Sequence, residues 1–340
     1  FCISVFKRTS EPRITFVVNQ TNIPVLKKIF LFIIVSFLAN WSAAQVAAPD
    51  LLCVKSDTLV WDIPTINCGP FNSYVIYGST SITGPYAVIS TVTDPTQDFY
   101  FHEDANNTNW YYYMVTDADC PGQPVLSSDT LDSNPPEASP IVFTDIENGE
   151  VLLEWMASPS PEVIGYIIYR STDIGTVPID TVTSLNYTDT AIDPNAPPET
   201  YYVIALDACG NTSLLINPHM TAFLEGEVET CEQSIYLNWA RYQGWTAIEK
   251  QEIWASIDGA TPVLLETVNG SDTSLVIPDL LDESEYCFFM ESYDALTGLS
   301  STSNTFCVSV DIIADVRFLE IKNISITNNN QAVVSWQWNQ

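Results

Sequence analysis

The chain has 340 residues, with 11 Lys and Arg against 42 Asp and Glu, and its net charge is −31 at pH 7. This length predicts two or three domains, each long enough to bury its own core. Such an acidic surface repels phosphate backbones and anionic membranes, so DNA and RNA are excluded as partners.

The first 44 residues are predicted to be absent from the mature protein. Residues 1–25 show no strand or helix pattern, and we interpret them as unstructured translation upstream of a start near Leu26. Residues 26–44 have the basic start, the apolar core and the small residues of a signal peptide, with cleavage expected between Ala44 and Gln45.

An uncleaved membrane anchor is the alternative for this segment. Its eleven-residue apolar core, Ile29–Ala39, would rise only about 16 Å as a helix, against about 30 Å of hydrocarbon. The chain is therefore expected to meet the membrane only during export. Removal of the leader leaves 6 Lys and Arg against 41 Asp and Glu, a net charge of −35.

Tryptophan marks a repeat along the rest of the chain. Runs that alternate apolar and polar residues lead to Trp61, Trp155, Trp239 and Trp336, spaced by 94, 84 and 97 residues. This alternation is typical of half-buried strands. A period of about 90 residues built from about seven short strands predicts a series of β-sandwiches.

Aromatic runs follow the first three Trp residues and extend the repeat. Tyr74-Val-Ile-Tyr77 and Tyr166-Ile-Ile-Tyr169 have counterparts at Glu252-Ile-Trp254. Tyr202 and Tyr286 each lie 47 residues beyond the Trp of their own unit. Equal internal spacing in two units indicates one repeated fold.

These features resemble fibronectin type III domains, which carry a Trp on the second strand and a Tyr at the start of the sixth. Leu280, six residues before Tyr286, resembles the tyrosine corner of that family. The resemblance covers nearly all of residues 46–340 and implies an all-β fold of tandem immunoglobulin-like sandwiches after an N-terminal signal helix. Such modules serve adhesion, spacing and scaffolding, so the fold does not select a function.

Composition places the boundaries between the units. The Pro-rich segment Asp132–Pro140 is expected to stiffen the first junction, and the chain ends two strands into a fourth unit, which indicates a fragment of a longer protein. The predicted domains are residues 46–134, 137–218 and 219–312, with 316–340 as the truncated start of the fourth.

Eight Cys in an exported chain predict disulfides. Cys2 lies in the leader, which leaves seven. In the first unit we expect Cys68 to pair with Cys120, because the loops that hold them lie at the same pole of a sandwich of this topology.

The other pairings follow from neighbouring strands and a shared junction. Cys287 and Cys307 fall on adjacent antiparallel strands of the third unit, and we expect them to pair. Cys209 and Cys231 are expected to pair across the junction between the second and third units. This scheme leaves Cys53 without a partner.

Metal binding has little support in the sequence. A zinc site needs closely spaced ligands, and the chain has no Cys-x-x-Cys and only two His, in different units. We interpret the acidity as a means of solubility. The alternative is divalent cations such as calcium at the junctions, bound by oxygen ligands such as Asp117, Asp119, Asp129 and Asp132.

No catalytic constellation is found. The chain has no Gly-x-Ser-x-Gly elbow and no Gly-rich phosphate loop, and His102 and His219 stand outside any nucleophile context. Paired carboxylates for glycoside hydrolysis would need a deep cleft, which a sandwich of about 90 residues does not indicate. We therefore expect no enzyme and no cofactor.

Tyr242 and Trp245 are the candidate ligand contacts. Both lie in the loop after the third Trp strand, where two flat rings could stack on a sugar or pack on a partner protein. The alternative is a loop that folds its own aromatics over the end of the core. The turn Asp207–Ser213 is explained by its Asp, Gly and Asn residues alone.

The acidic repeats, the Lys-Lys leader and sixth strands such as Tyr202–Asp207 resemble exported surface proteins of gliding Bacteroidetes. This resemblance implies a surface stalk or adhesin whose partner is an unknown surface protein or polysaccharide. The alternatives are an accessory region of a secreted polysaccharide-degrading enzyme, or a carbohydrate-binding module in its own right.

Overall fold

The computed structural model describes residues 45–339 apart from positions 104, 173–174, 194–195, 230–231, 312–317 and 330. The predicted leader, including Ala44, lies outside the described residues. All regular structure in the described part is β-strand. No described segment forms a helix long and apolar enough to cross a membrane.

The first sandwich consists of a three-stranded sheet packed against a four-stranded sheet. The first sheet has the order β1-β2-β5 and the second β4-β3-β6-β7, with all named pairs antiparallel, which is the fibronectin type III arrangement. The strands are β1 (Asp50–Lys55), β2 (Thr58–Asp62), β3 (Phe71–Ser79), β4 (Ala87–Val92), β5 (Phe99–Phe101), β6 (Tyr111–Ala118) and β7 (Leu131–Asp132).

The second sandwich repeats this plan, with sheets ordered β12-β9-β8 and β11-β10-β13-β14. Because β14 pairs with β13, this sheet extends to Met220, two residues past the boundary expected at 218. The strands are β8 (Ile141–Glu147), β9 (Glu150–Trp155), β10 (Val163–Thr172), β11 (Gly175–Val182), β12 (Asn186–Asp189), β13 (Thr200–Asp207) and β14 (His219–Met220).

The third sandwich adds one strand to its larger sheet. Its sheets are β15-β16-β19 and β18-β17-β20-β21, with β22 also paired to β20. The strands are β15 (Phe223–Glu229), β16 (Ser234–Ala240), β17 (Ile248–Ile257), β18 (Val263–Asn269), β19 (Ser274–Ile277), β20 (Glu285–Asp294), β21 (Ser300–Thr302) and β22 (Phe306–Ser309). A separate hairpin follows, β23 (Phe318–Ile326) with β24 (Ala332–Asn339).

The repeated Trp residues form the centres of three separate cores. Trp61, Trp155 and Trp239 are each at most 5% exposed and lie in the cores of the first, second and third sandwiches. Trp336, on the hairpin, is 60% exposed. Three of the four repeated Trp residues therefore mark sandwich cores, and the fourth does not.

One sixth-strand Tyr in each unit is buried with its hydroxyl hydrogen bonded, and in the second unit it is Tyr201 and not Tyr202, on which the equal spacing is based. In the third sandwich the Leu281 N–H donates to the Tyr286 hydroxyl over 2.9 Å, as a tyrosine corner requires. In the first sandwich the Tyr112 hydroxyl is hydrogen bonded to His102 Nδ1 over 2.8 Å, and in the second the Tyr201 hydroxyl donates to the Asp189 carboxylate. A buried Tyr hydroxyl needs a hydrogen-bond partner, and each of the three sandwiches provides a different one.

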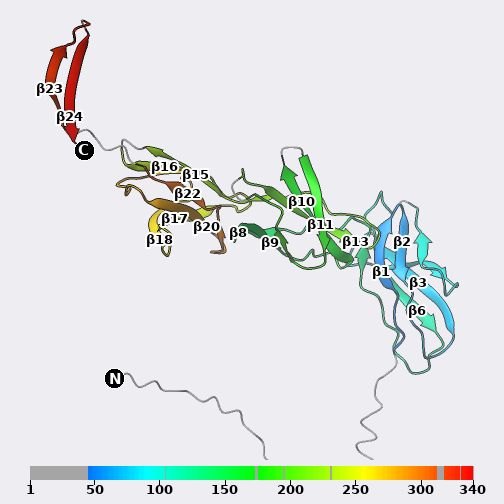
Figure 1. Ribbon diagram of the computed structural model, residues 1–340. Helices are drawn as coiled ribbons and strands as arrows, with labels where there is room; N and C mark the ends of the chain where they lie inside the picture. The colour runs from blue at the N-terminus through cyan, green and yellow to red at the C-terminus, as the bar shows by residue number, and fades with distance from the viewer. Residues whose placement is uncertain are drawn as a thin grey trace, which may run out of the picture.

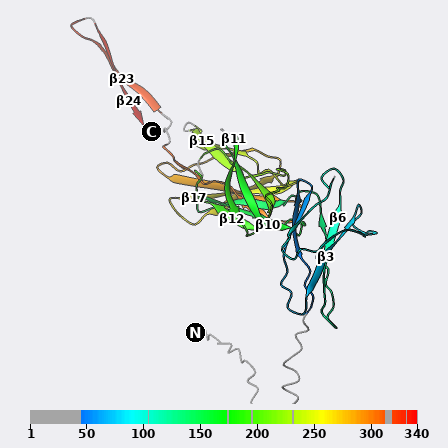
Figure 2. The same ribbon diagram turned by 90° about the vertical axis from the view of Figure 1, so that its right-hand side faces the viewer.

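The three sandwiches form an extended array (Figure 1). The second and third follow one another in line, whereas the strands of the first run across that line. In the view turned by 90°, the strands of the first sandwich again run vertically, beside the other two sandwiches (Figure 2). The hairpin of β23 and β24 projects from the far end in both views.

Candidate functional site

Two disulfides lie within single sandwiches. Cys68 and Cys120 are joined with a Cα–Cα distance of 5.1 Å, at the pole where a Cβ added at Gly69 would lie 1.8 Å from the Asp119 carbonyl oxygen. Cys287 and Cys307 are joined at 4.0 Å across β20 and β22. These are the two intradomain pairs that the sequence analysis proposes.

The third disulfide corrects the predicted scheme. Cys209 is joined to Cys53 of the first sandwich, with a Cα–Cα distance of 6.2 Å, and not to Cys231, which lies outside the described residues. Cys53, expected to be unpaired, therefore has a partner. This bond fastens the first sandwich to the second.

Strand direction explains the correction. The start of β8 pairs with the end of β9 at Ile141 and Trp155, and the start of β10 pairs with the end of β13 at Val163 and Asp207. The turn after β13, which holds Cys209, therefore lies at the pole where the second sandwich begins. At that pole the turn reaches Cys53 of the first sandwich.

The turn that carries Cys209 is held in shape by Asp207. Its Oδ1 accepts the N–H groups of Cys209 and Asn211 over 2.9 and 2.8 Å. Asn211 Nδ2 donates to the Val54 carbonyl oxygen of β1 over 3.0 Å, and Lys55 Nζ donates to the Cys209 carbonyl oxygen. Among the residues that the structure describes, the first junction thus combines a covalent bond with two hydrogen bonds between the sandwiches.

The second junction is packed without a covalent bond among the described residues. Trp245 Nε1 donates to the Val142 carbonyl oxygen of β8 over 2.9 Å. Ser301 Oγ donates to the Thr144 carbonyl oxygen, and the Thr302 N–H donates to Asp145 Oδ1, both over 2.6 Å. The edge strand β8 of the second sandwich is therefore covered by the third.

Tyr242 is the centre of this junction. It is 4% exposed and stacks on Trp245 with ring centroids 3.9 Å apart. Its hydroxyl accepts the Thr144 N–H over 2.9 Å and lies 2.5 Å from His219 Nδ1. Burial raises the pKa of Tyr242, so the hydroxyl keeps its proton and can donate it to that nitrogen.

These contacts leave only part of the predicted ligand platform open, because Tyr242 is buried whereas Trp245 is partly exposed. A sugar ring needs an open aromatic face, but the Tyr242 ring is buried between sandwiches and one face of Trp245 is covered by it. The alternative, a loop that folds its own aromatics over the end of the core, agrees with the structure, because Tyr242 belongs to the core of the third sandwich and Trp245 packs against that core. Both side chains also hydrogen bond to the backbone of the preceding sandwich.

His219 makes the stability of this junction pH-dependent. Burial lowers its pKa from 6.5 to about 4, although nearby Asp294 favours the charged form. In the unfolded chain His219 binds a proton near pH 6.5, so unfolding takes up a proton between pH 6.5 and 4. Stability is therefore full above pH 6.5 and falls as the pH decreases toward 4, by about 3 kcal/mol.

We expect His219→Gln to remove this part of the pH dependence, because Gln accepts the Tyr242 hydrogen bond and does not titrate. Urea unfolding at pH 7 and pH 4.5 gives the loss of stability on acidification, which is expected to be smaller in the His219→Gln variant than in the original protein. Equal losses of stability in both chains would contradict a neutral buried His219.

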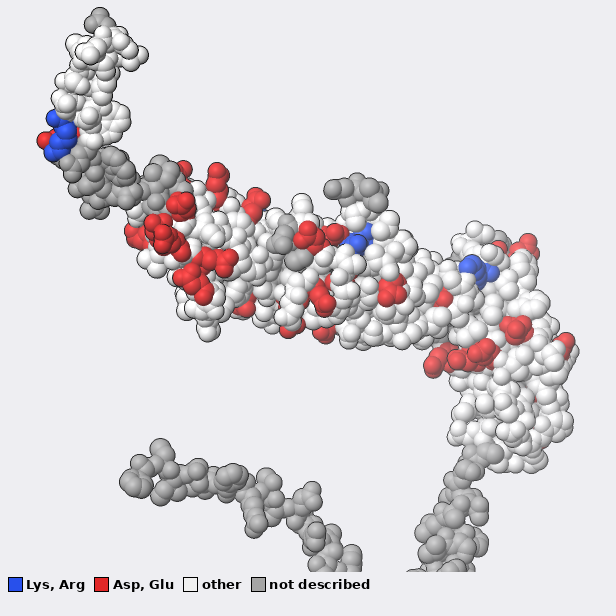
Figure 3. All heavy atoms as spheres, in the orientation of Figure 1, with Lys and Arg blue, Asp and Glu red and all other residues white. Residues whose placement is uncertain are grey.

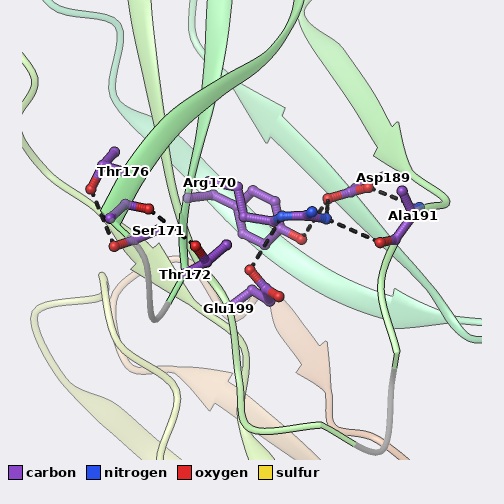
Figure 4. Close-up of polar contacts among 9 residues, drawn as sticks. Arg170, Ser171, Thr172, Thr176, Asp189, Ala191 and Glu199 are labelled. Carbon is purple, nitrogen blue, oxygen red and sulfur yellow. Dashed lines mark hydrogen bonds and ion pairs between the residues drawn. The ribbon is translucent and has the colours of Figure 1, made fainter.

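A buried ion pair lies inside the second sandwich (Figure 4). Arg170 Nη1 lies 2.7 Å from Oδ2 of Asp189, which is 2% exposed, and Arg170 Nε lies 3.3 Å from Glu199 Oε2. The Tyr201 hydroxyl donates to the same Asp189 oxygen over 3.0 Å, and the Ala191 N–H donates to Asp189 Oδ1. Arg170 pairs with both carboxylates within the fold, so we interpret the cluster as structural.

The proposed calcium ligands are not brought together. Asp117 pairs with Ser73 at the end of β6, whereas Asp132 pairs with Tyr111 at its start. Asp119 Oδ1 accepts a hydrogen bond from Asn72. Within the described ranges, no group of three or more His, Cys, Asp or Glu is arranged to hold a metal ion.

Comparisons with known proteins give distant structural likenesses. No protein-family model and no curated protein matches the chain. A structure of chicken CNTN1 FN1-FN3 domains aligns at 14% identity over 78% of this chain and 100% of that one, with a TM-score of 0.23.

Two further structures align at similar scores. A two fibronectin type III domain segment from chicken tenascin aligns at 16% identity over 52% of this chain and 99% of that one, with a TM-score of 0.22. Pectate lyase Pel3 from Pectobacterium carotovorum aligns at 17% identity over 31% of this chain and 30% of that one, with a TM-score of 0.24. The fold assignment rests on the sheet orders described above, which are those of fibronectin type III sandwiches repeated three times.

Proposed function

We propose that the chain is a non-catalytic spacer, exported to the cell surface, that holds an attached function at a set distance and direction. The observation that carries this proposal is the fastening of both junctions. The first is closed by the Cys53–Cys209 disulfide, and the second by the packing of Tyr242 and Trp245 on β8. Sandwiches joined only by linkers would move independently.

Disulfide use and surface charge support export. The described residues contain three disulfides, which form and persist in oxidising compartments. Acidic side chains are spread over all three sandwiches with few basic ones among them (Figure 3). A surface of this kind stays soluble and repels neighbouring copies.

A stalk or adhesin of gliding cells is the specific form that we propose. Its support is the resemblance of the acidic repeats and the leader to exported surface proteins of gliding Bacteroidetes. A carbohydrate-binding role is less well supported, because Tyr242 and Trp245, on which it rested, pack between the sandwiches.

Antibody labelling of intact cells tests surface display. An antibody against the third sandwich is expected to label unbroken cells, and external protease is expected to remove the signal. Deletion of the gene is expected to reduce attachment or gliding while polysaccharide hydrolysis is unchanged. An intracellular protein, or loss of hydrolysis with normal attachment, would overturn the proposal.

A further inference from the structure

A hollow of about 240 Å³ lies at the second junction, beside the Tyr242–Trp245 stack. We call it the junction hollow. Its walls are mostly apolar and come from both sandwiches. They include Pro140, Met156, Trp245, Leu296 and Leu299, with Asp294 among the polar lining residues.

The apolar walls are open to solvent at the rim. Met156 is 60% exposed and Leu296 is 77% exposed, on opposite sandwiches. The Trp245 indole N–H is already bonded to Val142, so this residue offers the hollow only apolar surface. The hollow is smaller than the about 300–1,000 Å³ of most small-molecule pockets, and it is suited to a single side chain.

Asp294 provides a buried carboxylate oxygen that lacks a hydrogen-bond donor among the described residues. The residue is 4% exposed, and its Oδ2 accepts the N–H and hydroxyl of Thr297 over 3.0 and 2.6 Å. Its Oδ1 has no hydrogen-bond donor among the described residues. A buried carboxylate oxygen left in this state costs free energy, which a donor entering the hollow would recover.

The charge of Asp294 is not compensated nearby. No Lys or Arg of the described residues forms an ion pair with it. His219, which also lines the hollow, is neutral at pH 7 because burial lowers its pKa to about 4. The chain as a whole carries −31, so its field attracts cations toward the site.

We propose that the junction hollow binds a lysine side chain of a partner protein. Binding displaces the turn that holds Leu296 and so uncovers Asp294 Oδ1, which is covered in the free chain. The ammonium group then donates to Asp294 Oδ1, and the aliphatic stem lies against Leu296, Met156 and Trp245. Lysine fits better than arginine because Oδ2 is already saturated by Thr297, whereas a guanidinium group bonds best to both oxygens of a carboxylate. The site uses both sandwiches, so it exists only while the second junction is closed.

NMR titration of the whole chain with Nα-acetyl-lysine N-methylamide tests the proposal. Saturable shifts are expected at the Trp245 indole and the Leu296 amide, with affinity in the millimolar range for so small a probe. The norleucine analogue, which lacks the ammonium group, is expected to bind at least tenfold more weakly. Equal binding of the two probes, or no shift with the lysine probe, would overturn the proposal.

Two variants distinguish binding at the junction hollow from attraction of the probe by the net charge of the protein. Asp294→Asn keeps an acceptor for Thr297 and removes the negative charge, so we expect at least a tenfold loss of binding with an unchanged amide spectrum elsewhere. Asp279→Asn removes an exposed charge of the same sandwich and is expected to bind like the original chain. Equal losses in both variants would show that net charge, and not the hollow, attracts the probe.

If Asp294→Asn disturbs the fold, Leu296→Ala provides the second measurement. Leu296 is exposed, so its truncation is expected to weaken binding severalfold without unfolding the sandwich. Unchanged binding in Leu296→Ala would place the probe elsewhere and overturn the proposal. Failure of the surface-display experiment would leave this result intact, because the binding measurement does not depend on location.

Discussion

Replacing Cys53 and Cys209 with Ser is expected to release the first sandwich from the second while all three remain folded. The Cys53–Cys209 disulfide is a covalent bond between the two folded sandwiches, and thermal motion does not break it. The two interdomain hydrogen bonds that remain, from Lys55 and Asn211, contribute about 1 kcal/mol each. The disulfide therefore dominates the first junction.

NMR relaxation measures this release directly. In the original chain, amides of the first and second sandwiches are expected to report one common tumbling time, whereas in the double Ser variant the first sandwich tumbles faster. Replacing Cys68 and Cys120 with Ser is the matched control, because that disulfide lies inside the first sandwich. Common tumbling in the Cys53 and Cys209 variant would contradict a covalent lock.

Arg170→Met is expected to destabilise the second sandwich by about 3–5 kcal/mol, the range for removal of one partner from a buried ion pair. Asp189, which is 2% exposed, would be left in the core without the guanidinium group. Tyr201 and Ala191 would still donate to it, but neutral donors do not replace a positive charge. Urea unfolding measures the loss.

Two further variants decide whether burial causes this effect. Lys250→Met removes an ion pair whose Lys side chain is 39% exposed, and it is expected to cost less than about 1 kcal/mol. Adding Asp189→Asn to Arg170→Met removes the stranded carboxyl group and is expected to restore part of the stability. A loss in Arg170→Met as small as in Lys250→Met would contradict the account.

The three sandwiches are predictable from the sequence because their cores impose a period. Trp61, Trp155 and Trp239 must be buried on the second strand of each unit, so their spacing reports the fold directly. The pairing of Cys68 with Cys120 follows from the same topology, since their loops share a pole. Local pattern and topology suffice for features that lie within one sandwich.

Features that depend on how two sandwiches meet are not predictable in this way. The pairing of Cys209 with Cys53 joins residues 156 positions apart, and only the pole at which the turn lies selects it over Cys231. Tyr242 and Trp245 have the composition of a binding loop, yet their environment is the edge strand of the preceding sandwich. Asp294 is one of 42 acidic residues, and only its burial distinguishes it.

Small-angle X-ray scattering tests the central claim that the array has one fixed shape. The scattering of the oxidised chain is expected to fit a single arrangement of the three sandwiches, with the first set across the line of the other two (Figures 1 and 2). After replacement of Cys53 and Cys209 with Ser, the curve is expected to require a range of orientations of the first sandwich alone. An oxidised chain that already requires such a range would contradict the account.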